Sequence, residues 1–433
     1  MKKLCILFGV LLMLPACGGI DLPDSDGDGI PDLIDPCPND PDPACVPDGG
    51  GNEGAYDCNN PPNLAGKFLG SFDSMGSRVI VVLRDNDESQ GVINRMSTIS
   101  DIAGLQGVKF FAPGSFVATV ADIETVTALL ADPGVLYVSQ ERTYTVNPKV
   151  QPLDVSTWGL DRIDQRDLPL DKSYTPTGTG TGIHVDIIDT GVGTSIDGVD
   201  SNPEFGGRLI APCHTEHTFR GCADGHGHGT HVAGTVGGQK WGVAKGVFLH
   251  SIRVLNENGS GTTSQVIGGI NKSAQWARES GQLRIANMSL GGSPDPPLDQ
   301  AVCDAMADGV VFAIAAGNES NDANTSSPAR VLQALTLGAS DKKDSVASFS
   351  NYGPTVDIFG PGVDVESERP DGGSQTYSGT SMAAPHAAGA LALYLAAHPD
   401  ATVDEVIAGV VAAGTPDKLS GIKGSPNLLL FVE

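Results

Sequence analysis

Three short stretches of this 433-residue chain place reactive side chains next to glycines, which let another backbone approach closely. The first, "DTGVG", begins at Asp189. The second, "GHGHGTHVAGT", carries His226, His228 and His231, and the third, "SGTSMAAP", carries Ser381. Nucleophilic acyl transfer uses an aspartate, a histidine and a serine, because a base must remove the proton of the attacking hydroxyl. The three stretches therefore indicate one reaction site assembled from distant parts of the chain.

The spacing of the histidines also allows a metal site. A His-x-His-x-x-His pattern can direct several imidazoles at one zinc ion, whereas a single histidine can act as a general base beside two bystanders. The stretch differs by one residue from the His-x-His-x-Asp-His signature of the metallo-β-lactamase fold, with Thr230 in place of the needed carboxylate. No further histidine follows in a matching context, so the general base is favoured.

The elements that must position these residues alternate between strands and helices from Trp158 onward. "IHVDII" predicts a strand that runs into Asp189, and the near-continuously apolar run that starts at Ser381 predicts a buried central helix. Further helices are predicted at 264–280 and 298–309, and further strands at 283–288 and 310–316. This alternation is typical of a parallel sheet with helices on both faces. A serine at a helix start lies beside free N–H groups, which favour a developing oxyanion.

The composition and the N-terminal residues indicate which classes of partner to expect and where the protein is located. The net charge is −26, and the Lys and Arg clusters that phosphate binding needs do not appear, so nucleic acid is not an expected partner. Residues 1–16 open with two lysines and an apolar run, which is typical of an export signal. The following "LPAC" resembles a bacterial lipobox and predicts a lipid anchor on Cys17. Ordinary secretion with an incidental Cys17 is the alternative.

Residues 17–76 are rich in Gly, Pro, Asp and Asn, which predicts an acidic linker. Within it, "DSDGDGIPDLID" carries carboxylates at Asp24, Asp26, Asp28, Asp32 and Asp35. Such oxygen ligands around a glycine turn suit Ca²⁺, but the bidentate Glu of an EF-hand is missing. The segment instead resembles a thrombospondin type 3 calcium repeat. A solvated acidic linker that binds no calcium is the alternative.

Residues 77–150 have the composition of an ordinary globular domain. Strands predicted at 79–83, 108–111, 116–120 and 135–138, with helices near 92–102 and at 123–132, give the order βαββαβ of a small ferredoxin-like unit. Asp122 is the expected N-cap of the second helix, and Pro133-Gly134 ends it. The polar, proline-containing stretch that follows marks the boundary to a larger domain at 151–433.

Six cysteines remain outside the export signal and the lipobox: Cys37, Cys45, Cys58, Cys213, Cys222 and Cys303. Export makes disulfides possible. The first two, and likewise Cys213 and Cys222, are close enough in sequence to bridge local loops. Cys303 lies in an apolar helical pattern and is predicted to be a buried thiol, which leaves the partner of Cys58 open.

The motifs "DTGV", "GHGTHVAGT", "SLGG", "AAGN" and "GTSMAAPH" occur in this order, and together they resemble the subtilisin-like serine proteases. "WGLDRIDQRDLPLD" and "SNYGPTVDIFGPG" are similar to the proteinase K branch. The resemblance runs from Trp158 to the C-terminus, and the preceding βαββαβ unit looks like the family's inhibitory propeptide. It implies a subtilisin-like α/β fold, with a doubly wound, mostly parallel sheet, and the hydrolysis of peptide bonds.

Carried over to this sequence, the resemblance implies a role for each residue of the site. Ser381 would be the nucleophile and His228 the general base, while Asp189 would orient His228 and stabilise its imidazolium. Asn318 in "AAGN" matches the family's oxyanion donor, which acts together with the Ser381 N–H.

The other histidines of these motifs are expected to be structural. His231 would pack inside a helix beside the base, and His386 would pack one turn into the serine helix. His226 stands where the family usually has Asn, and we expect it in a solvent-facing turn.

The resemblance also implies a substrate cleft. The walls of the primary specificity pocket match Ser289, Leu290, Gly291, Gly292, Ala315, Ala316 and Gly317. These residues leave the pocket open, which implies broad cleavage after apolar or aromatic residues. Gly259, Ser260 and Gly261 match the edge strand that pairs with the substrate backbone. Thr263 stands where this branch often carries an aromatic lid over a more distant subsite, so a preference at that subsite is in doubt.

Asp357 matches a calcium ligand of the family, completed by the backbone carbonyls of Leu332 and Ala334. One carboxylate with backbone oxygens suits a hard cation. A capping or salt-bridged Asp357 is the alternative.

We therefore expect an exported serine endopeptidase that acts on proteins or peptides, holds structural Ca²⁺ and is made as a precursor inhibited by its own propeptide. Its mature form is expected to be monomeric, with membrane contact only through Cys17. Self-cleavage between Asn147 and Leu153 would release the catalytic domain, unless the propeptide holds it non-covalently. A catalytically inactive, calcium-dependent surface-binding protein on the same fold is the alternative.

Overall fold

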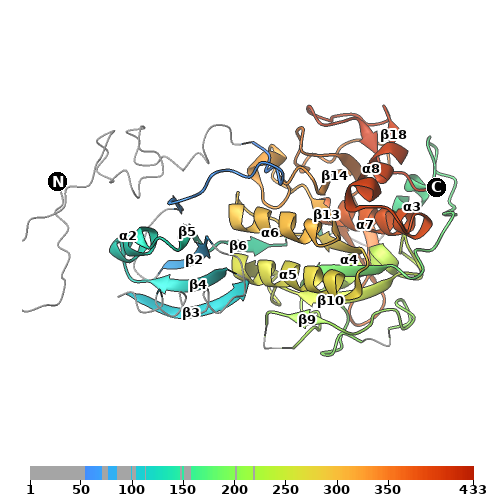
Figure 1. Cartoon of the computed structure of the whole chain (residues 1–433). Coiled ribbons are helices and arrows are strands. Elements are labelled where there is room, and N and C mark those ends of the chain that lie inside the picture. Colours follow the sequence, from blue (N-terminus) through green and yellow to red (C-terminus); the bar gives the residue numbers. More distant parts are fainter. Residues whose placement is uncertain are drawn as a thin grey trace, which may run out of the picture. The chain divides into compact units, whose positions relative to one another are not determined.

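Figure 1 shows the computed structural model of the chain, which describes residues 54–70, 77–84, 99, 104–112, 114–146, 149–150, 158–199, 202–217 and 220–433. These residues form a small unit, Pro62–Glu141, and a large unit that combines Gly54–Pro61 with Arg142–Glu433. The predicted export signal, the predicted lipobox, the predicted calcium repeat, Cys37, Cys45 and most of the helix expected at 92–102 lie outside the described residues. No helix in the described ranges is long and apolar enough to cross a membrane.

The small unit is a five-stranded sheet packed against α2 (Ile123–Ala131). Its strands, in spatial order, are β1 (Phe68–Leu69), β5 (Val135–Gln140), β2 (Ser77–Leu83), β4 (Ser115–Val120) and β3 (Leu105–Ala112). β1 runs parallel to β5, and the other neighbours are antiparallel. Asp122 caps α2 as predicted, because its carboxylate accepts a hydrogen bond from the N–H of Thr125 at 2.9 Å.

β1 lies in the stretch that we expected to be a linker. Leu64, Phe68 and Leu69 are buried, and the last two pair with Val138 and Ser139 of β5. The prediction of a linker is therefore wrong for residues 54–70. Its error has a local cause: apolar residues are sparse across residues 17–76 as a whole, and this average concealed a short run that can be buried.

The large unit is built on a nine-stranded sheet. In spatial order its strands are β18 (Thr415–Pro416), β19 (Leu428–Leu429), β15 (Ile358–Pro361), β14 (Leu335–Ser340), β13 (Val310–Ala315), β12 (Arg284–Met288), β8 (His184–Asp189), β10 (Phe248–Arg253) and β9 (His214–Thr215). All neighbours are parallel except β18 and β19. The predicted mostly parallel sheet is confirmed. The carboxyl ends of β8, β12 and β13 lie together, because these three strands are neighbours.

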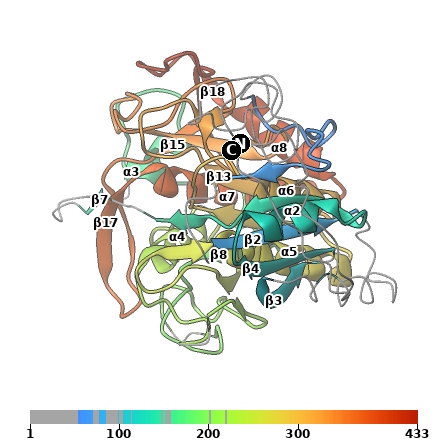
Figure 2. The ribbon, with the colours of Figure 1, turned by 90° about the vertical axis from the view of Figure 1, so that its left-hand side faces the viewer.

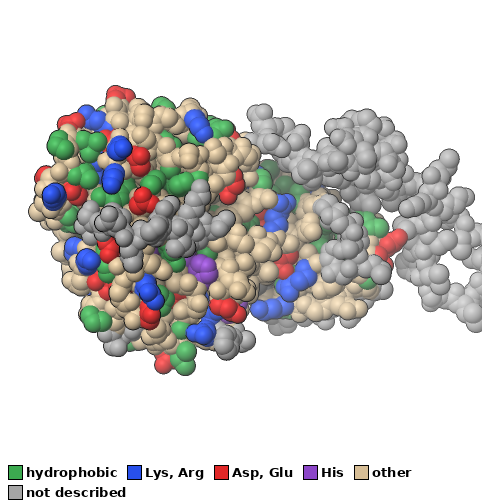
Figure 3. Space-filling model, turned by 180° about the vertical axis from the view of Figure 1, so that it is seen from behind, with side chains coloured by type: hydrophobic (Ala, Val, Ile, Leu, Met, Phe, Trp, Pro, Cys, Tyr) green, Lys and Arg blue, Asp and Glu red, His purple; other side chains and the backbone are tan. Residues whose placement is uncertain are grey.

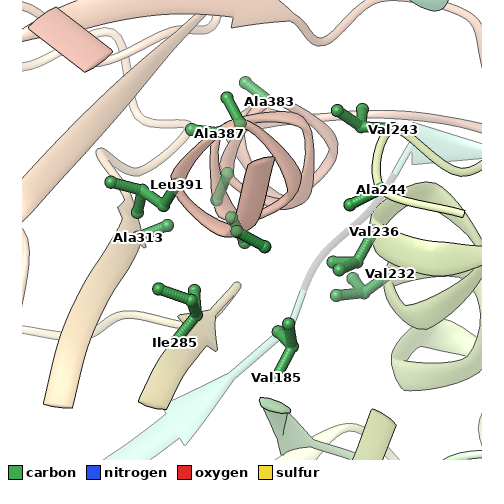
Figure 4. Close-up of a cluster of buried hydrophobic side chains, with 14 of the residues drawn as sticks. Val185, Val232, Val236, Val243, Ala244, Ile285, Ala313, Ala383, Ala387 and Leu391 are labelled. Carbon is green, nitrogen blue, oxygen red and sulfur yellow. The ribbon is translucent and has the colours of Figure 1, made fainter. Parts of the chain in front are cut away.

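Helices cover both faces of this sheet: α4 (His228–Gly237), α5 (Thr263–Ser280), α6 (Pro296–Ala307), α7 (Thr380–Ala397) and α8 (Val403–Ala413). Successive residues of β8 point to opposite faces. Val185 and Ile187 enter the core that contains Val232 of α4 and much of α7, and Figure 4 shows this convergence. Asp186 points the other way and accepts a hydrogen bond from Ser273 of α5 at 2.6 Å. Thus α4 and α7 share one face of the sheet, and α5 covers the other.

α3 (Trp158–Ile163) is buried along its whole length. The fully buried guanidinium of Arg162 binds Asp344 in a bidentate ion pair, with Nε 2.7 Å from Oδ1 and Nη2 3.1 Å from Oδ2. Its Nη1 donates to the carbonyl of Gln165 at 2.7 Å. Removing one partner of such a pair would leave an uncompensated buried charge, so α3 is firmly held in the large unit.

Residues 142–150 contribute two short strands to the large unit. β6 (Thr143–Thr145) pairs antiparallel with β11 (Ser260–Thr262). β7 (Lys149–Val150) pairs antiparallel with β17 (Ser374–Ser378), as Figure 2 shows, and β17 pairs in turn with β16 (Val365–Glu368). The domain boundary expected at 150/151 thus differs from the structure, in which the chain joins the large unit at Arg142.

The buried carboxylate of Asp224 joins the end of β8 to the start of α4. Its Oδ1 accepts hydrogen bonds from Oγ1 of Thr190 at 2.9 Å and from the backbone N–H groups of His226 and Gly227 at 2.9 and 2.7 Å. Its Oδ2 accepts from the N–H and the Oγ1 of Thr230 at 2.9 and 2.6 Å. These contacts satisfy N–H groups that a helix start leaves without intrahelical partners.

Replacing Asp224 by Ala leaves these donors without their acceptor in a buried place. We expect the free energy of unfolding to fall by about 3 kcal/mol, as measured by denaturant unfolding at neutral pH. Asp197→Ala is the matched control, because Asp197 is exposed in a nearby loop, and its effect should stay within about 0.5 kcal/mol. Equal effects of the two substitutions would show that the Asp224 network contributes little.

Candidate active site

Asp189 and His228 meet where β8 ends and α4 begins. Both are fully buried, and Nδ1 of His228 lies 2.8 Å from Oδ1 and 2.9 Å from Oδ2 of Asp189. Because an ionised carboxylate only accepts hydrogen bonds, Nδ1 carries the hydrogen and Nε2 presents its lone pair. Nε2 is buried and has no hydrogen-bond partner among the described residues. One nitrogen is therefore left in the state that a general base needs.

A glycine permits this close meeting of strand and helix. A Cβ on Gly229 would lie 2.1 Å from the carbonyl oxygen of Gly191 and 3.1 Å from Oδ1 of Asp189. Any larger side chain would therefore push the start of α4 away from the end of β8. This steric requirement explains a glycine directly after His228 in "GHGTH".

Ser381 is the second residue of α7 and is almost wholly buried. Its Oγ donates a hydrogen bond to the carbonyl oxygen of Ser289 at 3.2 Å, and in the described part of the chain no hydrogen bond joins Ser381 to His228. Catalytic hydrogen bonds are often long or misaligned before a substrate binds. A change of rotamer at Ser381 would redirect its Oγ.

Asn318 follows β13, and its amide is oriented by Thr380. Its Oδ1 accepts from the backbone N–H of Thr380 at 2.8 Å and from the Oγ1 of Thr380 at 3.0 Å. A backbone N–H can only donate, so this contact assigns the oxygen of the amide, and the NH₂ group is the end that remains for a ligand.

The expected pocket walls lie at the carboxyl ends of neighbouring strands. Ser289 and Leu290 follow β12, Ala315 ends β13 and Ala316 follows it; all four are buried, while the glycines that follow are partly exposed. Ser289 donates from its Oγ to the carbonyl oxygen of Ser381 at 2.8 Å. Of these expected wall residues, Ser289 thus lies directly beside Ser381.

The expected edge strand is occupied by the chain itself. In the β6–β11 pair, Thr145 lies opposite Ser260 and Tyr144 opposite Gly261. On its other side, Thr145 forms an antiparallel bridge with Gly291, and the N–H of Val146 donates to the carbonyl of Gly259 at 2.9 Å. Residues 143–146 therefore lie extended between two backbone segments, as a peptide bound by strand addition does.

The remaining histidines have different partners. His231 is fully buried, its Nε2 lies 3.1 Å from the carbonyl of Val365, and burial above all lowers its pKa to about 3. His386 is buried, its Nδ1 lies 2.8 Å from the carbonyl of Met382, and burial lowers its pKa to about 4. Both fit the structural roles predicted for them.

His226 is not in a solvent-facing turn, and that prediction is wrong. The side chain is half-buried, and its ring centroid lies 6.2 Å from that of His228. A Cβ added to Gly259 would come within 3.2 Å of its Nε2. Burial, followed by the nearby His228, lowers the pKa of His226. The imidazole is partly covered because it lies beside Gly259, the residue that precedes β11.

Asp357 directly precedes β15 and is partly buried. Its Oδ2 accepts from the N–H of Thr336 at 2.7 Å, and burial raises its pKa to about 7. The described residues contain no group of three or more His, Cys, Asp or Glu side chains that could hold a metal ion, so a cation at Asp357 would depend on backbone oxygens.

The cysteines follow the prediction in one case and contradict it in another. Cys213 and Cys222 form the expected local disulfide. Cys303 is not a free thiol but is bonded to Cys58, 245 residues away. Its helical pattern was interpreted correctly, since Cys303 is buried in α6, but the segment that carries its partner was assigned to the linker.

Two further residues were missed. Asp224 orients the start of α4, and Asp295 lies beneath the side chain of Tyr144, as described below. In sequence both have ordinary explanations, as a turn residue and as the N-cap of a helix. Prolines at the first positions of a helix, as in α6, are common and point to no distant partner of the N-cap residue.

Comparison with known proteins bears on the family of the chain. The model of the subtilase family matches residues 180–424. "Alkaline serine exoprotease A" of Vibrio alginolyticus is 42% identical over 346 residues, which cover 79% of this chain but only 63% of that protein. "Extracellular serine proteinase" of Thermus sp. (strain Rt41A) is 43% identical over 337 residues, 76% of this chain and 79% of that protein.

A solved structure described as that of a cold adapted subtilisin-like serine proteinase has 44% sequence identity and a TM-score of 0.60. It covers 64% of this chain, which in turn covers 98% of that chain. The subtilisin-like fold and serine protease character predicted from the motifs are confirmed. The chain therefore belongs to the subtilase family of subtilisin-like serine proteases.

Proposed function

We propose that this chain is an endopeptidase that hydrolyses peptide bonds through an acyl-enzyme on Ser381. The Oγ of Ser381 bonds to the carbonyl carbon of the scissile peptide while its proton passes to Nε2 of His228. That proton then goes to the leaving amine, and water hydrolyses the acyl group by the reverse route. The observation that carries the proposal is the buried pair of Asp189 and His228, because it fixes the tautomer in which Nε2 can accept the proton.

Asn318 and the backbone N–H of Ser381 are the proposed donors to the oxyanion. The fixed Oδ1 of Asn318 supports this role, because it leaves the NH₂ group for the substrate. The N–H of Ser381 lies in the first turn of α7, where N–H groups lack intrahelical partners. Donors held in place before the reaction cost no reorganisation when the charge develops.

The substrates are proposed to be proteins and peptides, cleaved broadly after apolar or aromatic residues. The small residues at Gly291, Gly292 and Gly317 support an open primary pocket. On the face that Figure 3 shows, acidic and basic side chains are interspersed rather than gathered. We propose a monomeric mature enzyme.

The chain is proposed to be a self-processing precursor with the small unit as its inhibitory propeptide. This proposal is supported by residues 143–146, which pair with the cleft on both sides. It is also supported by β7, whose Lys149 lies opposite Ser378, three residues before Ser381. The cut is proposed between Asn147 and Leu153, a range that begins shortly after β6 and includes β7.

Calcium is proposed as a structural ion at Asp357, with the carbonyls of Leu332 and Ala334. The donor set fits a hard cation, and a carboxylate whose pKa burial has raised would gain from a positive charge beside it. The ion would hold the loop before β14 and would take no part in bond cleavage. The acidic repeat at Asp24 to Asp35 is a second proposed calcium segment and lies outside the described residues.

Export through residues 1–16 and lipidation of Cys17 remain proposals, supported by the sequence pattern alone. The relative named as extracellular, from Thermus, is in keeping with export. The inactive surface-binding alternative is not favoured, because the named relatives are proteases.

A fluorophosphonate probe tests the proposed function, because it reacts only with an activated serine. We expect wild-type protein in calcium to be labelled and shortened, and Ser381→Ala to be neither. Labelling that a chelator abolishes would tie the active fold to calcium, and labelling unaffected by chelation would count against the calcium site. A folded, shortened wild-type chain without label would contradict the proposed activity.

Asn318→Ala should lower kcat on a peptide substrate by about 10²–10³-fold, the loss typical of an oxyanion donor in this family, with little change in KM. Asn318→Asp separates donation from orientation, since it keeps an oxygen for the N–H of Thr380 but has no NH₂ group. We expect it to be at least as slow as Asn318→Ala. Near-normal kcat in either folded variant would remove Asn318 from the mechanism.

A further inference from the structure

Tyr144 occupies a side pocket of the substrate cleft. Its side chain is fully buried, although the neighbouring Thr143 and Thr145 of β6 are exposed. One wall is Gly292, where an added Cβ would lie 3.0 and 3.1 Å from ring carbons of Tyr144. The ring therefore lies against the wall, and the glycine makes room for an aromatic side chain.

The end of this pocket is a buried carboxylate. The phenolic oxygen of Tyr144 donates to Oδ2 of Asp295 at 2.8 Å, and Oγ1 of Thr263 donates to the same oxygen at 2.7 Å. Asp295 is fully buried, and its Oδ1 has no hydrogen-bond partner in the described ranges. A buried carboxylate depends strongly on such donors, so losing the phenol would be costly.

The side chain of Asp295 does not cap α6, although Asp295 directly precedes this helix. It is the N-cap of that helix, where an Asp side chain ordinarily accepts from the first-turn N–H groups. Here the carboxylate makes no capping hydrogen bond, and it is turned toward Thr263 and Tyr144 instead. Burial raises the pKa of Tyr144 well above its usual value, with Asp295 as the next cause, so the phenol remains a donor.

We propose that this pocket selects tyrosine over phenylalanine in protein substrates, with Asp295 and Thr263 reading the phenolic hydroxyl. The inference rests on the proposed function, because it takes β6 as a template for a bound substrate. A site built to bind a hydroxyl rejects the analogue that lacks it, since a buried polar group is then left unpaired. Specificity here comes from a hydrogen bond and not from the aromatic lid that is absent at Thr263.

The register of β6 gives the position of this subsite relative to the cleaved bond. Thr145 lies opposite Gly291 in an antiparallel bridge, so a substrate residue two positions later would lie opposite Ser289. The carbonyl of Ser289 accepts the hydrogen bond of Ser381. The substrate residue opposite Ser289 is therefore followed by the bond that is presented to Ser381. The position that Tyr144 occupies is three residues before this substrate residue.

Two chromogenic peptides test the proposal on processed enzyme: Thr-Tyr-Thr-Val-Phe-p-nitroanilide and the same peptide with Phe at its second position. We expect kcat/KM to be at least about tenfold higher for the Tyr peptide. In Asp295→Ala this ratio should fall toward one, whereas Ser293→Ala, an exposed change in the same loop, should keep it.

The outcomes separate the subsite from the activity. Equal kcat/KM values for the two peptides on wild-type enzyme would overturn the tyrosine preference, even if Asp295→Ala does not fold. An unchanged ratio in folded Asp295→Ala would also overturn it. Cleavage of neither peptide by an enzyme that takes no fluorophosphonate label would instead be a failure of the proposed function.

A second, independent observation concerns the segment Gly54–Pro61, which lies before the small unit in the chain but belongs to the large one. Tyr56 is buried, its N–H donates to the carbonyl of Arg330 at 2.7 Å, and its carbonyl accepts from the N–H of Leu332 at 2.9 Å. Its phenol donates to Oε1 of Gln300 at 2.8 Å. This segment, which we name the clasp, is thus bound by backbone and side chain alike.

A disulfide closes the clasp. Cys58 is bonded to Cys303 of α6, and its N–H donates to Oε1 of Gln333 at 2.9 Å. Gln333 also donates to Oδ1 of Asp57 at 2.7 Å. Every residue of the small unit and the whole proposed processing region lie between the two bonded cysteines in sequence.

We infer that the processed enzyme is a two-chain molecule, with its N-terminal piece held by the Cys58–Cys303 bond. A cut between residues 147 and 153 leaves both pieces joined, and so does any later digestion of the small unit. The catalytic part is therefore not released by processing, contrary to the expectation from chain order. Residues 17–53, including Cys17, stay attached upstream of the clasp. This inference rests on the proposed self-cleavage.

Electrophoresis of wild-type protein that carries different epitopes at residue 50 and at the C-terminus tests the inference. Without reductant we expect one band with both epitopes, and with reductant two bands with one epitope each. Cys58→Ser should give two bands without reductant, and Ser381→Ala one band in both conditions.

The controls distinguish the two ways to fail. Separate wild-type bands without reductant would overturn the two-chain molecule. A single wild-type band that persists after reduction would mean that no cut was made, which is a failure of the proposed self-cleavage. If Cys58→Ser is degraded, the comparison of wild-type protein with and without reductant still shows whether the processed enzyme is a two-chain molecule.

Discussion

The site depends on the buried carboxylate of Asp224, which is not expected to touch substrate. Asp189 ends a strand and His228 starts a helix 39 residues later, and the two ring-to-carboxylate contacts exist only if these ends stay together. Asp224 holds them, because its oxygens bind Thr190 on one side and the turn and Thr230 on the other. Gly229 permits the end of β8 and the start of α4 to lie close together, and the hydrogen bonds of Asp224 hold them there.

Much of this arrangement follows from sequence. Glycine-flanked Asp, His and Ser motifs, and strands that end beside them, predict side chains gathered at the carboxyl edge of a parallel sheet. Asp224 and Asp295 could not be identified in the same way. A turn Asp and an N-cap Asp look alike whether they serve their own segment or a distant one, and only the folded chain shows where the oxygens point.

Long-range pairing was equally out of reach. Six cysteines allow many connectivities, and Cys58 lies in a stretch whose average composition resembles a linker. The buried apolar residues of the clasp and of β1 are few, and their burial depends on surfaces formed much later in the sequence. The half-buried position of His226 has the same origin, because it lies beside Gly259, 33 residues later in the chain.

β6 makes two kinds of contact in the cleft: backbone pairing, which does not depend on the side chains, and a specific side-chain contact at Tyr144. Backbone pairing with Ser260, Gly261 and Gly291 ignores side chains and accepts any extended peptide. Exposed Thr143 and Thr145 add little, whereas the buried Tyr144 meets a charged oxygen. Within β6, the main chain makes the pairing contacts, and the side chain of Tyr144 makes the buried hydrogen bond on which the proposed tyrosine preference rests.

The buried helix α3 has a consequence for the ends of the processed protein. Its six residues are buried, and the bidentate ion pair of Arg162 and Asp344 holds the helix in the large unit. In sequence, α3 follows the proposed processing region. Under the proposed processing, products whose N-termini differ only upstream of Trp158 would all keep α3 and its buried ion pair. Such N-termini would then be equivalent for the fold of the catalytic part.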